Sequence, residues 1–561
     1  YLYKSFNNIV IMKNIMADIR KNIVKELCID EFLIEEPVIH GDFAVPCFKI
    51  SKEKNPAEYA KELSKKLKID LIKSITPIGP YINFYIDWKK FNKKVIETVL
   101  KEKHNYGSSK IKETVMMDVF QANPFKAFHI GHVKNALHGE SLRRILEFTG
   151  RKTYTVNFNG DVGIHVARWL LYYNKYYKGK LPSKDFTKWV GEIYAKAANK
   201  AKEDIKFEEQ AQELNRKIDK KDKEILKQWK KIRDLCYKDF EKIRKELDIK
   251  VDKVIPESEC VEPGKKIVMK YYTQGKLKKS NGAIGIDLEK YGLGFFLLLK
   301  ADGTALYSTK DIGLLELKKK WKKFDKQIYV VATEQEFYFK QLFRTFDILG
   351  LYPMDKCIHA YYSFVRLKQG KMSSRLGNII LYEDLRDEAI ERVKKEIQKR
   401  KTKLNKDTIK KIAMSAIKFT MLYPENRKPI NFDWDEALNF EGKSGPYLQY
   451  SYVRALKILE KVKQDKNIDY SLLNEKEELQ LIKKIAKFPD IVIKAANEYS
   501  PSEIAKYAFK LCSLFSVFYE KHPVISASEK LKKSRSALVA AFKQTLENCF
   551  NLLGMYTIKK M

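Results

Sequence analysis

The spacing of hydrophobic residues changes once between residues 115 and 150, and this change predicts a strand followed by a helix. Val115-Met116-Met117 is a short apolar run, and Asn123-Pro124 ends it because proline cannot donate to a strand ladder. Apolar residues then recur every three or four positions up to Gly150, as on one face of a helix: Val133, Ala136, Leu137, Leu142, Ile145 and Leu146. Residues 129–132 therefore stand where a strand passes into a helix N-terminus.

A second strand follows this helix. Residues 153–158 are β-branched and aromatic, and 159–161 read as a tight turn. A strand, helix and strand of this length predict a right-handed crossover and a parallel sheet, whose ligands bind beyond the carboxyl ends of the strands. Further apolar runs predict strands over 283–288, 295–299 and 328–332.

The pattern divides the chain into three regions. Residues 1–108 read as an α/β module, with helices over 18–27 and 56–67 and strands over 42–50 and 82–86. Residues 109–382 hold the parallel sheet, with a charged helical insertion at about 166–262 that carries no recognisable chemistry. Residues 383–561 predict helices with no strand, over 383–400, 406–423, 445–463, 475–496, 501–520 and 528–554.

Charge and composition narrow the function. The formal net charge of +37 favours a polyanionic partner, although a lysine-rich composition arising from codon bias would add to it. Seven cysteines without a C-x-x-C spacing predict neither a disulfide framework nor a structural metal site. No run approaches 18 apolar residues, so we expect no membrane segment and a cytoplasmic protein.

His129 and His132 carry the first candidate chemistry. Free N–H groups and the helix dipole make a helix N-terminus an anion site, and Gly131 lets a ligand approach the backbone. Two imidazoles there suit nucleotide phosphates. The alternative readings of H-x-x-H alone are a metal pair and an incidental occurrence.

The residues HIGH at 129–132 form the first signature of class I aminoacyl-tRNA synthetases, which this chain resembles. KMSSR at 371–375 is similar to the second signature of that class, the KMSKS loop. The wider segments ANPFKAFHIGH, LYSTKDIG, YVVATEQEFYFKQLF and GPYLQYSYVRAL resemble arginyl-tRNA synthetases in particular, and the resemblance extends from about Gly41 to Met561. It implies a multidomain α/β fold: a Rossmann-like catalytic domain, an N-terminal α/β module and a C-terminal all-helical anticodon-binding domain.

The resemblance also implies an activity. L-arginine and ATP, brought as its Mg²⁺ complex, would form arginyl-adenylate and pyrophosphate, and arginine would pass to the 2′-hydroxyl of the terminal ribose of tRNA(Arg). We expect a monomer without a structural metal. The residues implied for catalysis are His129, His132, Lys126 and Lys371, and those implied for ATP binding also include Gly131, Met372, Ser373, Ser374 and Arg375.

Recognition of arginine and of tRNA would use two further sets. A guanidinium prefers carboxylates, and the residues implied for arginine binding are Asp118, Gln121, Ala122, Asn123, His132, Tyr307, Asp311 and Gln335. Those expected to contact tRNA, by stacking and hydrogen bonding to unpaired bases, are Tyr81, Asn83, Tyr447, Tyr450 and Arg454. Packing within their own modules is the alternative, and for Tyr450 it has at least equal weight.

Four residues at three places depart from the family pattern. Gln121-Ala122 replaces a pair that frequently contains serine, and Tyr338 stands where histidine is common. Ser374 replaces the second lysine of KMSKS, as in many arginyl enzymes. The rival interpretations are another class I synthetase, a small nucleotidylyl transferase and a non-catalytic RNA-binding descendant.

Overall fold

The computed structural model describes residues 14–37, 39–51, 54–367, 380–462 and 467–561. At its centre lies a five-stranded sheet in the order β11-β10-β4-β5-β6, and every neighbouring pair is parallel. Helix α4 (Ile130–Phe148) connects the first two strands in sequence, as predicted. The strands are β4 (Thr114–Asp118), β5 (Lys152–Asn159), β6 (Lys253–Pro256), β10 (Lys326–Tyr329) and β11 (Cys357–His359).

The expectation that 166–262 is a purely helical insertion was wrong at its C-terminal end. Four helices come first, but the chain then returns to the sheet as β6 and continues into α9 (Glu257–Thr273). A strand of four residues after a long charged helix is too short to show a period of its own. The four helices are α5 (Ile164–Tyr176), α6 (Phe186–Glu203), α7 (Ile205–Asp219) and α8 (Lys223–Leu247).

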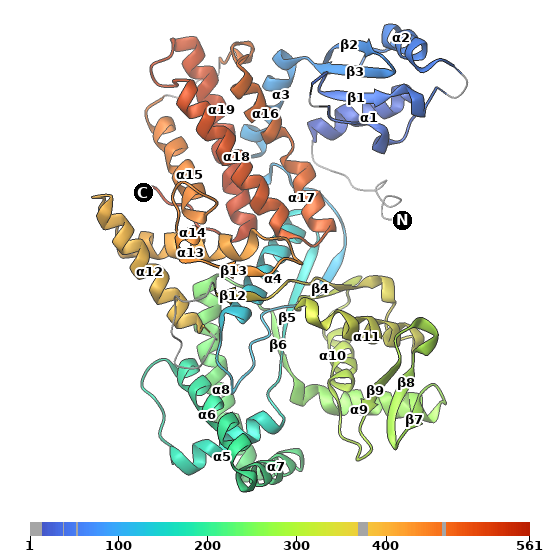
Figure 1. Cartoon of the computed structure of the whole chain (residues 1–561), viewed down its shortest axis with the longest axis vertical. Helices are drawn as coiled ribbons and strands as arrows, with labels where there is room; N and C mark the ends of the chain where they lie inside the picture. Colours follow the sequence, from blue (N-terminus) through green and yellow to red (C-terminus); the bar gives the residue numbers. More distant parts are fainter. Residues whose placement is uncertain (1–13, 38, 52–53, 368–379, 463–466) are drawn as a thin grey trace.

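The N-terminal region is an α/β module with an antiparallel sheet in the order β1-β3-β2 (Figure 1). The strand expected over 42–50 is shorter, since β1 ends at Pro46 and a 3-10 turn follows over Cys47–Lys49. Pro46 has no N–H with which to continue a ladder. The elements are α1 (Ile15–Leu27), β1 (Phe43–Pro46), α2 (Pro56–Lys66), β2 (Ile72–Ile78), β3 (Tyr81–Ile86) and α3 (Trp88–Glu102).

A third sheet lies beside the central one, and its hydrophobic core also includes Tyr329 of β10 and Cys357 of β11. It is antiparallel in the order β7-β8-β9, and it shares its core with α10 and α11. This places the strands expected over 283–288 and 295–299 outside the central sheet. The elements are β7 (Lys278–Ser280), β8 (Ala283–Asp287), β9 (Phe295–Leu299), α10 (Tyr307–Trp321) and α11 (Glu336–Ile348).

Beyond residue 382 the chain is mostly helical, with two corrections. The strand β13 (Ile430–Phe432) pairs in parallel with β12 (Val365–Leu367), a pairing too short and too distant in sequence to predict. The helix expected over 475–496 breaks at Lys487, because Pro489 lies in the first turn of the next helix and lacks an N–H for a continuous one. The helices are α12 (Tyr382–Lys399), α13 (Lys406–Leu422), α14 (Trp434–Ala437), α15 (Gly445–Glu460), α16 (Lys476–Ala486), α17 (Phe488–Asn497), α18 (Pro501–Lys521) and α19 (Glu529–Leu553).

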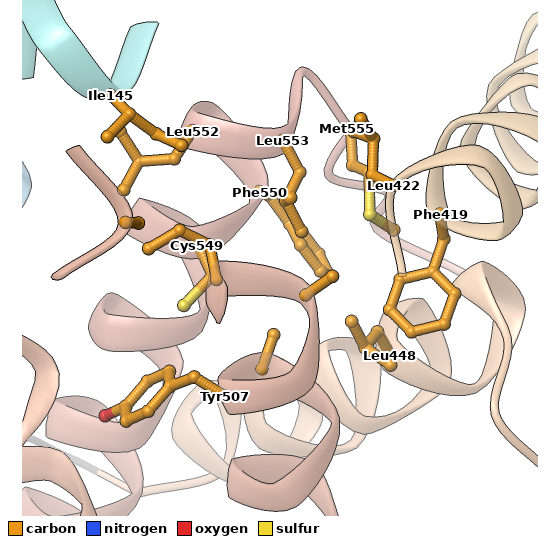
Figure 2. Close-up of a cluster of buried hydrophobic side chains, with 14 of the residues drawn as sticks. Ile145, Phe419, Leu422, Leu448, Tyr507, Cys549, Phe550, Leu552, Leu553 and Met555 are labelled. Carbon is orange, nitrogen blue, oxygen red and sulfur yellow. The ribbon is translucent and has the colours of Figure 1, made fainter. Parts of the chain in front are cut away.

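The C-terminal half of α4 is buried against these helices. Ile145 lies beside Leu552 of α19, within a cluster that also holds Phe419 of α13 and Leu448 of α15 (Figure 2). All four side chains are fully buried. The helix that begins at His129 is therefore part of both the central sheet's core and the C-terminal bundle's core, and the predicted architecture is confirmed.

Candidate active site

The loop between β4 and α4 is held in an uncommon backbone conformation. Phe120, Gln121 and Phe125 have φ angles of 72°, 41° and 65°, a region that residues other than glycine rarely occupy. The rings of Phe120 and Phe125 are buried, so side-chain packing supports the strained backbone. The loop delivers His129 to the N-cap position of α4.

The two histidines of this turn have defined tautomers. The Gly131 N–H donates to Nδ1 of His129 over 3.1 Å, and the His129 N–H donates to Nδ1 of His132 over 3.3 Å. Burial, with a smaller contribution from Lys126, lowers the pKa of His129 to about 4 and the pKa of His132 well below its usual value. Both rings are therefore neutral at pH 7, and each carries its hydrogen on Nε2, where it can donate to an anion.

Lys126 lies beside these rings and next to a buried ion pair. Its Nζ is 5.7 Å from the centroid of the Tyr194 ring, and burial lowers its pKa while the charge of Glu257 opposes that change. Glu257, the first residue of α9, accepts from Lys310 over 2.6 Å, with side-chain exposures of 6% and 13%. Sequence reasoning missed this pair. The sequence did place Glu257 directly after Ile255-Pro256. Once these residues are known to end a strand of the central sheet, Glu257 is expected at the edge where ligands bind.

Asp311 is one of the two buried acids of the predicted arginine set, the other being Asp118. Asp311 lies on α10 one turn after Tyr307, and the Tyr338 hydroxyl donates to it. Burial raises the pKa of Asp311 to about 7, and the Tyr338 hydrogen bond opposes the rise. Tyr307 is 63% exposed, with Nζ of Lys310 5.0 Å from its ring centroid. Tyr338, which the sequence marked only as a departure from the family pattern, is therefore the direct partner of Asp311.

Asp118 ends β4 and is engaged by the protein itself. Nζ of Lys318 on α10 lies 2.6 Å from its Oδ1 and 2.7 Å from its Oδ2. Burial raises the pKa of Asp118, and the charge of Lys318 opposes that rise. Nothing in the sequence pairs these two residues, since they are 200 positions apart.

The other predicted arginine-site residues lie at the same edge of the sheet. Oδ1 of Asn123 accepts from the Gly160 N–H over 2.6 Å, which joins the β4–α4 loop to the end of β5. Gln121 is half-buried, Ala122 is buried, and Gln335 is exposed in the 3-10 turn that follows β10. Lys371, Met372, Ser373, Ser374 and Arg375 lie outside the described residues.

The residues expected to contact tRNA are partly occupied by packing. Asn83 is buried in β3, while Tyr81 is half-buried with its ring 5.7 Å from that of Phe48. The hydroxyl of Tyr447 on α15 lies 3.1 Å from the hydroxyl of Ser516 on α18. The Arg454 guanidinium stands over Tyr450 at 4.4 Å and over Tyr519 at 4.8 Å, and it also donates to the Tyr450 hydroxyl. Tyr519 was not among the predicted residues.

The described part of the chain holds neither a metal-binding cluster nor a membrane-spanning helix. Among these residues, no group of three or more His, Cys, Asp or Glu side chains is arranged to hold a metal ion. No helix there combines the length and hydrophobicity needed to cross a membrane.

Comparison with known families matches two adjoining parts of the chain. Residues 95–434 match the model described as "tRNA synthetases class I (R), catalytic domain". Residues 448–561 match the model described as "DALR anticodon binding domain". The first match includes the central sheet, α4 and the acidic residues of α10.

Relatives and solved structures agree with these matches. The arginine–tRNA ligase of Clostridium kluyveri is 34% identical over 557 residues, which is 97% of this chain and 98% of that protein. The fold is similar to arginyl-tRNA synthetase of Thermus thermophilus, with a TM-score of 0.80 at 23% identity over 97% of this chain and 99% of that one. It is also similar to the enzyme from Plasmodium falciparum, with a TM-score of 0.77 at 21% identity over 97% and 98% of the two chains.

Proposed function

Because this chain belongs to the class I arginyl-tRNA synthetases, an arginine–tRNA ligase family, we propose how its own residues carry out the reaction. The reaction has two steps. The arginine carboxylate attacks the α-phosphate of ATP and expels pyrophosphate, and a hydroxyl of the terminal tRNA ribose then attacks the arginyl carbonyl and releases AMP.

His129 and His132 donate to the phosphates during the first step. Both rings are neutral and present Nε2–H at the positive end of the α4 dipole. The N–H groups expected to be free for an anion are partly used, since that of Ile130 donates to the Ile380 carbonyl and that of Gly131 donates to His129. Neutral donors leave the charge of the triphosphate to be matched by cations. Lys126 and Lys371 supply that charge together with the Mg²⁺ that enters with ATP, while Gly131, Met372, Ser373, Ser374 and Arg375 complete the ATP contacts.

Asp311 binds the substrate guanidinium, and this buried acid is the single observation that carries the assignment. It lies on α10 beside the Tyr307 phenol. Glu257 lies between Asp311 and Lys126 in the electrostatic sense, because its charge raises the pKa of both groups. Asn123 and Gln335 bind the amino and carboxyl groups of the substrate, with Gln121, Ala122 and His132 beside them. Asp118, at the end of β4, is already paired with Lys318 and so adds little net charge of its own.

The tRNA contacts two modules in this proposal. Tyr81 contacts it from the N-terminal module, where Asn83 is buried in β3 and does not reach the surface, and Tyr447, Tyr450 and Arg454 contact the anticodon. The Arg454 guanidinium stands over the rings of Tyr450 and Tyr519, and this cluster supports the role, because arginine donors beside aromatic rings suit hydrogen bonding and stacking with an unpaired base. The seven free cysteines support a reducing, cytoplasmic compartment. The protein is a monomer in this proposal, and sedimentation at working concentration tests that state.

Pyrophosphate exchange with each of the twenty amino acids, with and without total tRNA, tests the function. We expect exchange with arginine and with no other amino acid. Exchange with another amino acid would reassign the specificity, and exchange with none would overturn the enzymatic proposal.

The Asp311→Asn variant tests the assigned acid. A neutral amide cannot pair with a guanidinium, so we expect the KM for arginine to rise by the equivalent of about 2–5 kcal/mol. The KM for ATP should change little. An unchanged KM for arginine would show that Asp311 is structural.

A further inference from the structure

Lys318 is a buried lysine that has no role in the proposed reaction. Its side chain is 0% exposed and that of Asp118 is 1% exposed, and Nζ lies 2.6 Å from Oδ1. The Tyr329 ring covers the ammonium, with its centroid 4.3 Å from Nζ. Taking two charges out of water costs free energy that apolar side chains would not. Stability alone is therefore a poor reason for this ion pair.

Its position relates the pair to the arginine site. Lys318 is seven residues, or two helical turns, after Asp311 on α10, so the two side chains share a face. Asp118 raises the pKa of Asp311, and Lys318 lowers it. The ionisable groups that face Asp311 come from α10 and from four other elements. Those on α10 are Tyr307 and Lys318, and the others are Asp118 of β4, Glu257 and Cys260 of α9, Tyr329 of β10 and Tyr338 of α11.

We propose that Lys318 is a positioning residue for arginine recognition: its ammonium neutralises Asp118, so that Asp311 can ionise and present one net negative charge to the guanidinium. The proposal rests on the proposed role of Asp311. Two carboxylates that share a buried region do not both ionise readily unless a cation stands with them. With Lys318 in place, the two acids and one ammonium sum to a single negative charge, which matches one guanidinium.

Lys318→Met tests the proposal through the pH dependence of the KM for arginine, measured by pyrophosphate exchange with tRNA present. Without the ammonium, we expect the pH at which arginine binding is half-maximal to rise by about one unit or more, because Asp118 and Asp311 then oppose each other's ionisation. The KM for ATP should follow the parent enzyme at every pH. A folded variant with the parent's midpoint would overturn the proposal.

The double variant Asp118→Asn with Lys318→Met separates charge from packing. It removes both charges, so its midpoint should return close to that of the parent. A midpoint as high as that of the single variant would overturn the proposal. If Lys318→Met does not fold, Asp118→Asn alone is compared with the double variant. Asp118→Asn keeps the ammonium of Lys318, so its pH midpoint for arginine binding should be lower than that of the double variant. Equal midpoints would overturn the proposal.

Lys418→Met is the matched control. Lys418 of α13 is as buried as Lys318, but its Nζ donates to the Gly554 carbonyl over 2.6 Å and no acid of the arginine site influences it. We expect its midpoint to equal the parent's even where stability falls, and a matching rise would overturn the proposal. Asp311→Asn separates the two ideas: an unchanged KM for arginine rejects the role of Asp311, whereas a raised KM together with an unmoved Lys318→Met midpoint rejects only that of Lys318.

Discussion

At the scale of single residues, His129 and His132 leave the negative charge of the triphosphate to be balanced by other groups. Their Nδ1 atoms accept from the backbone, so each ring is a neutral Nε2–H donor and not a cation. The signature HIGH was recognisable in the sequence. The tautomers and the absence of charge follow only from the folded turn, where burial lowers the pKa of both rings.

Lys126→Ala should slow adenylate formation by about 10²–10³-fold, the usual scale for removing one transition-state contact. Lys126 is the cation beside the two neutral rings, and Ser374 brings none. Single-turnover formation of arginyl-adenylate measures the effect, and Lys110→Ala, an exposed lysine, is the control. Adding Ser374→Lys should restore part of the rate. If Lys126→Ala forms the adenylate at the rate of the parent enzyme, Lys126 is not the cation in question and Arg375 takes that role.

Arginine binding should strengthen as the pH rises through about 7, because burial raises the pKa of Asp311 to about 7 and only the ionised acid pairs with a guanidinium. The Tyr338 hydrogen bond lowers this pKa, so Tyr338→Phe should move the KM profile to higher pH. The free energy of unfolding has the opposite pH dependence. Asp311 keeps its proton in the folded state up to about pH 7, whereas the unfolded chain loses it near pH 4, so the contribution of Asp311 to stability falls from about pH 4 to pH 7. A flat KM profile would contradict the prediction.

At the scale of elements, α9 and α10 bring the two halves of the site together through two glycines. A Cβ on Gly264 would lie 2.0 Å from the Thr309 carbonyl oxygen, and a Cβ on Gly313 would lie 2.0 Å from the Cys260 carbonyl oxygen. The helices therefore touch backbone to backbone, which places Glu257 of α9 beside Lys310 of α10. The sequence contained both glycines but gave no sign that they face each other.

Gly313→Ala should push α9 and α10 apart, since a methyl group has no room against a backbone carbonyl. We expect a loss of about 1–3 kcal/mol in the free energy of unfolding, as for other overpacked cores, and a raised KM for arginine. Urea denaturation and pyrophosphate exchange measure the two effects. Lys320→Ala, on the exposed side of α10, should change both little. An equally stable Gly313→Ala variant would show that the helices can adjust.

At the scale of the whole molecule, α4 joins the ATP site to the C-terminal bundle. Its Lys134 ammonium donates to the Met421 carbonyl at the end of α13 over 2.6 Å, and its Ser141 hydroxyl donates to the Leu552 carbonyl at the end of α19 over 2.8 Å. The N-terminal module is tied to the same bundle, where Arg20 pairs with Asp490 over 2.9 Å. A ligand that binds both modules can thus bias the position of His129.

Arginine activation should therefore depend on tRNA, as it does in the family that the sequence resembles. Nuclease-treated enzyme should show little pyrophosphate exchange, and purified tRNA(Arg) should restore it. The control is total tRNA depleted of arginine acceptors, which should not. Full exchange without any tRNA would contradict the prediction and leave the contacts of α4 with a structural role only.

The sequence by itself determined the family, the parallel sheet, the helix that starts at His129 and most of the C-terminal helices, because these depend on local periodicity and contiguous motifs. It could not determine β6 or the β12–β13 pairing, where three or four residues are too few to show a period. The break at Lys487 was missed although Pro489, which causes it, stands in the sequence. Tertiary structure alone decided which charges meet. Asp118 with Lys318 and Glu257 with Lys310 are pairs between distant segments, and burial, which sets the protonation of Asp311 and of both histidines, exists only in the folded chain.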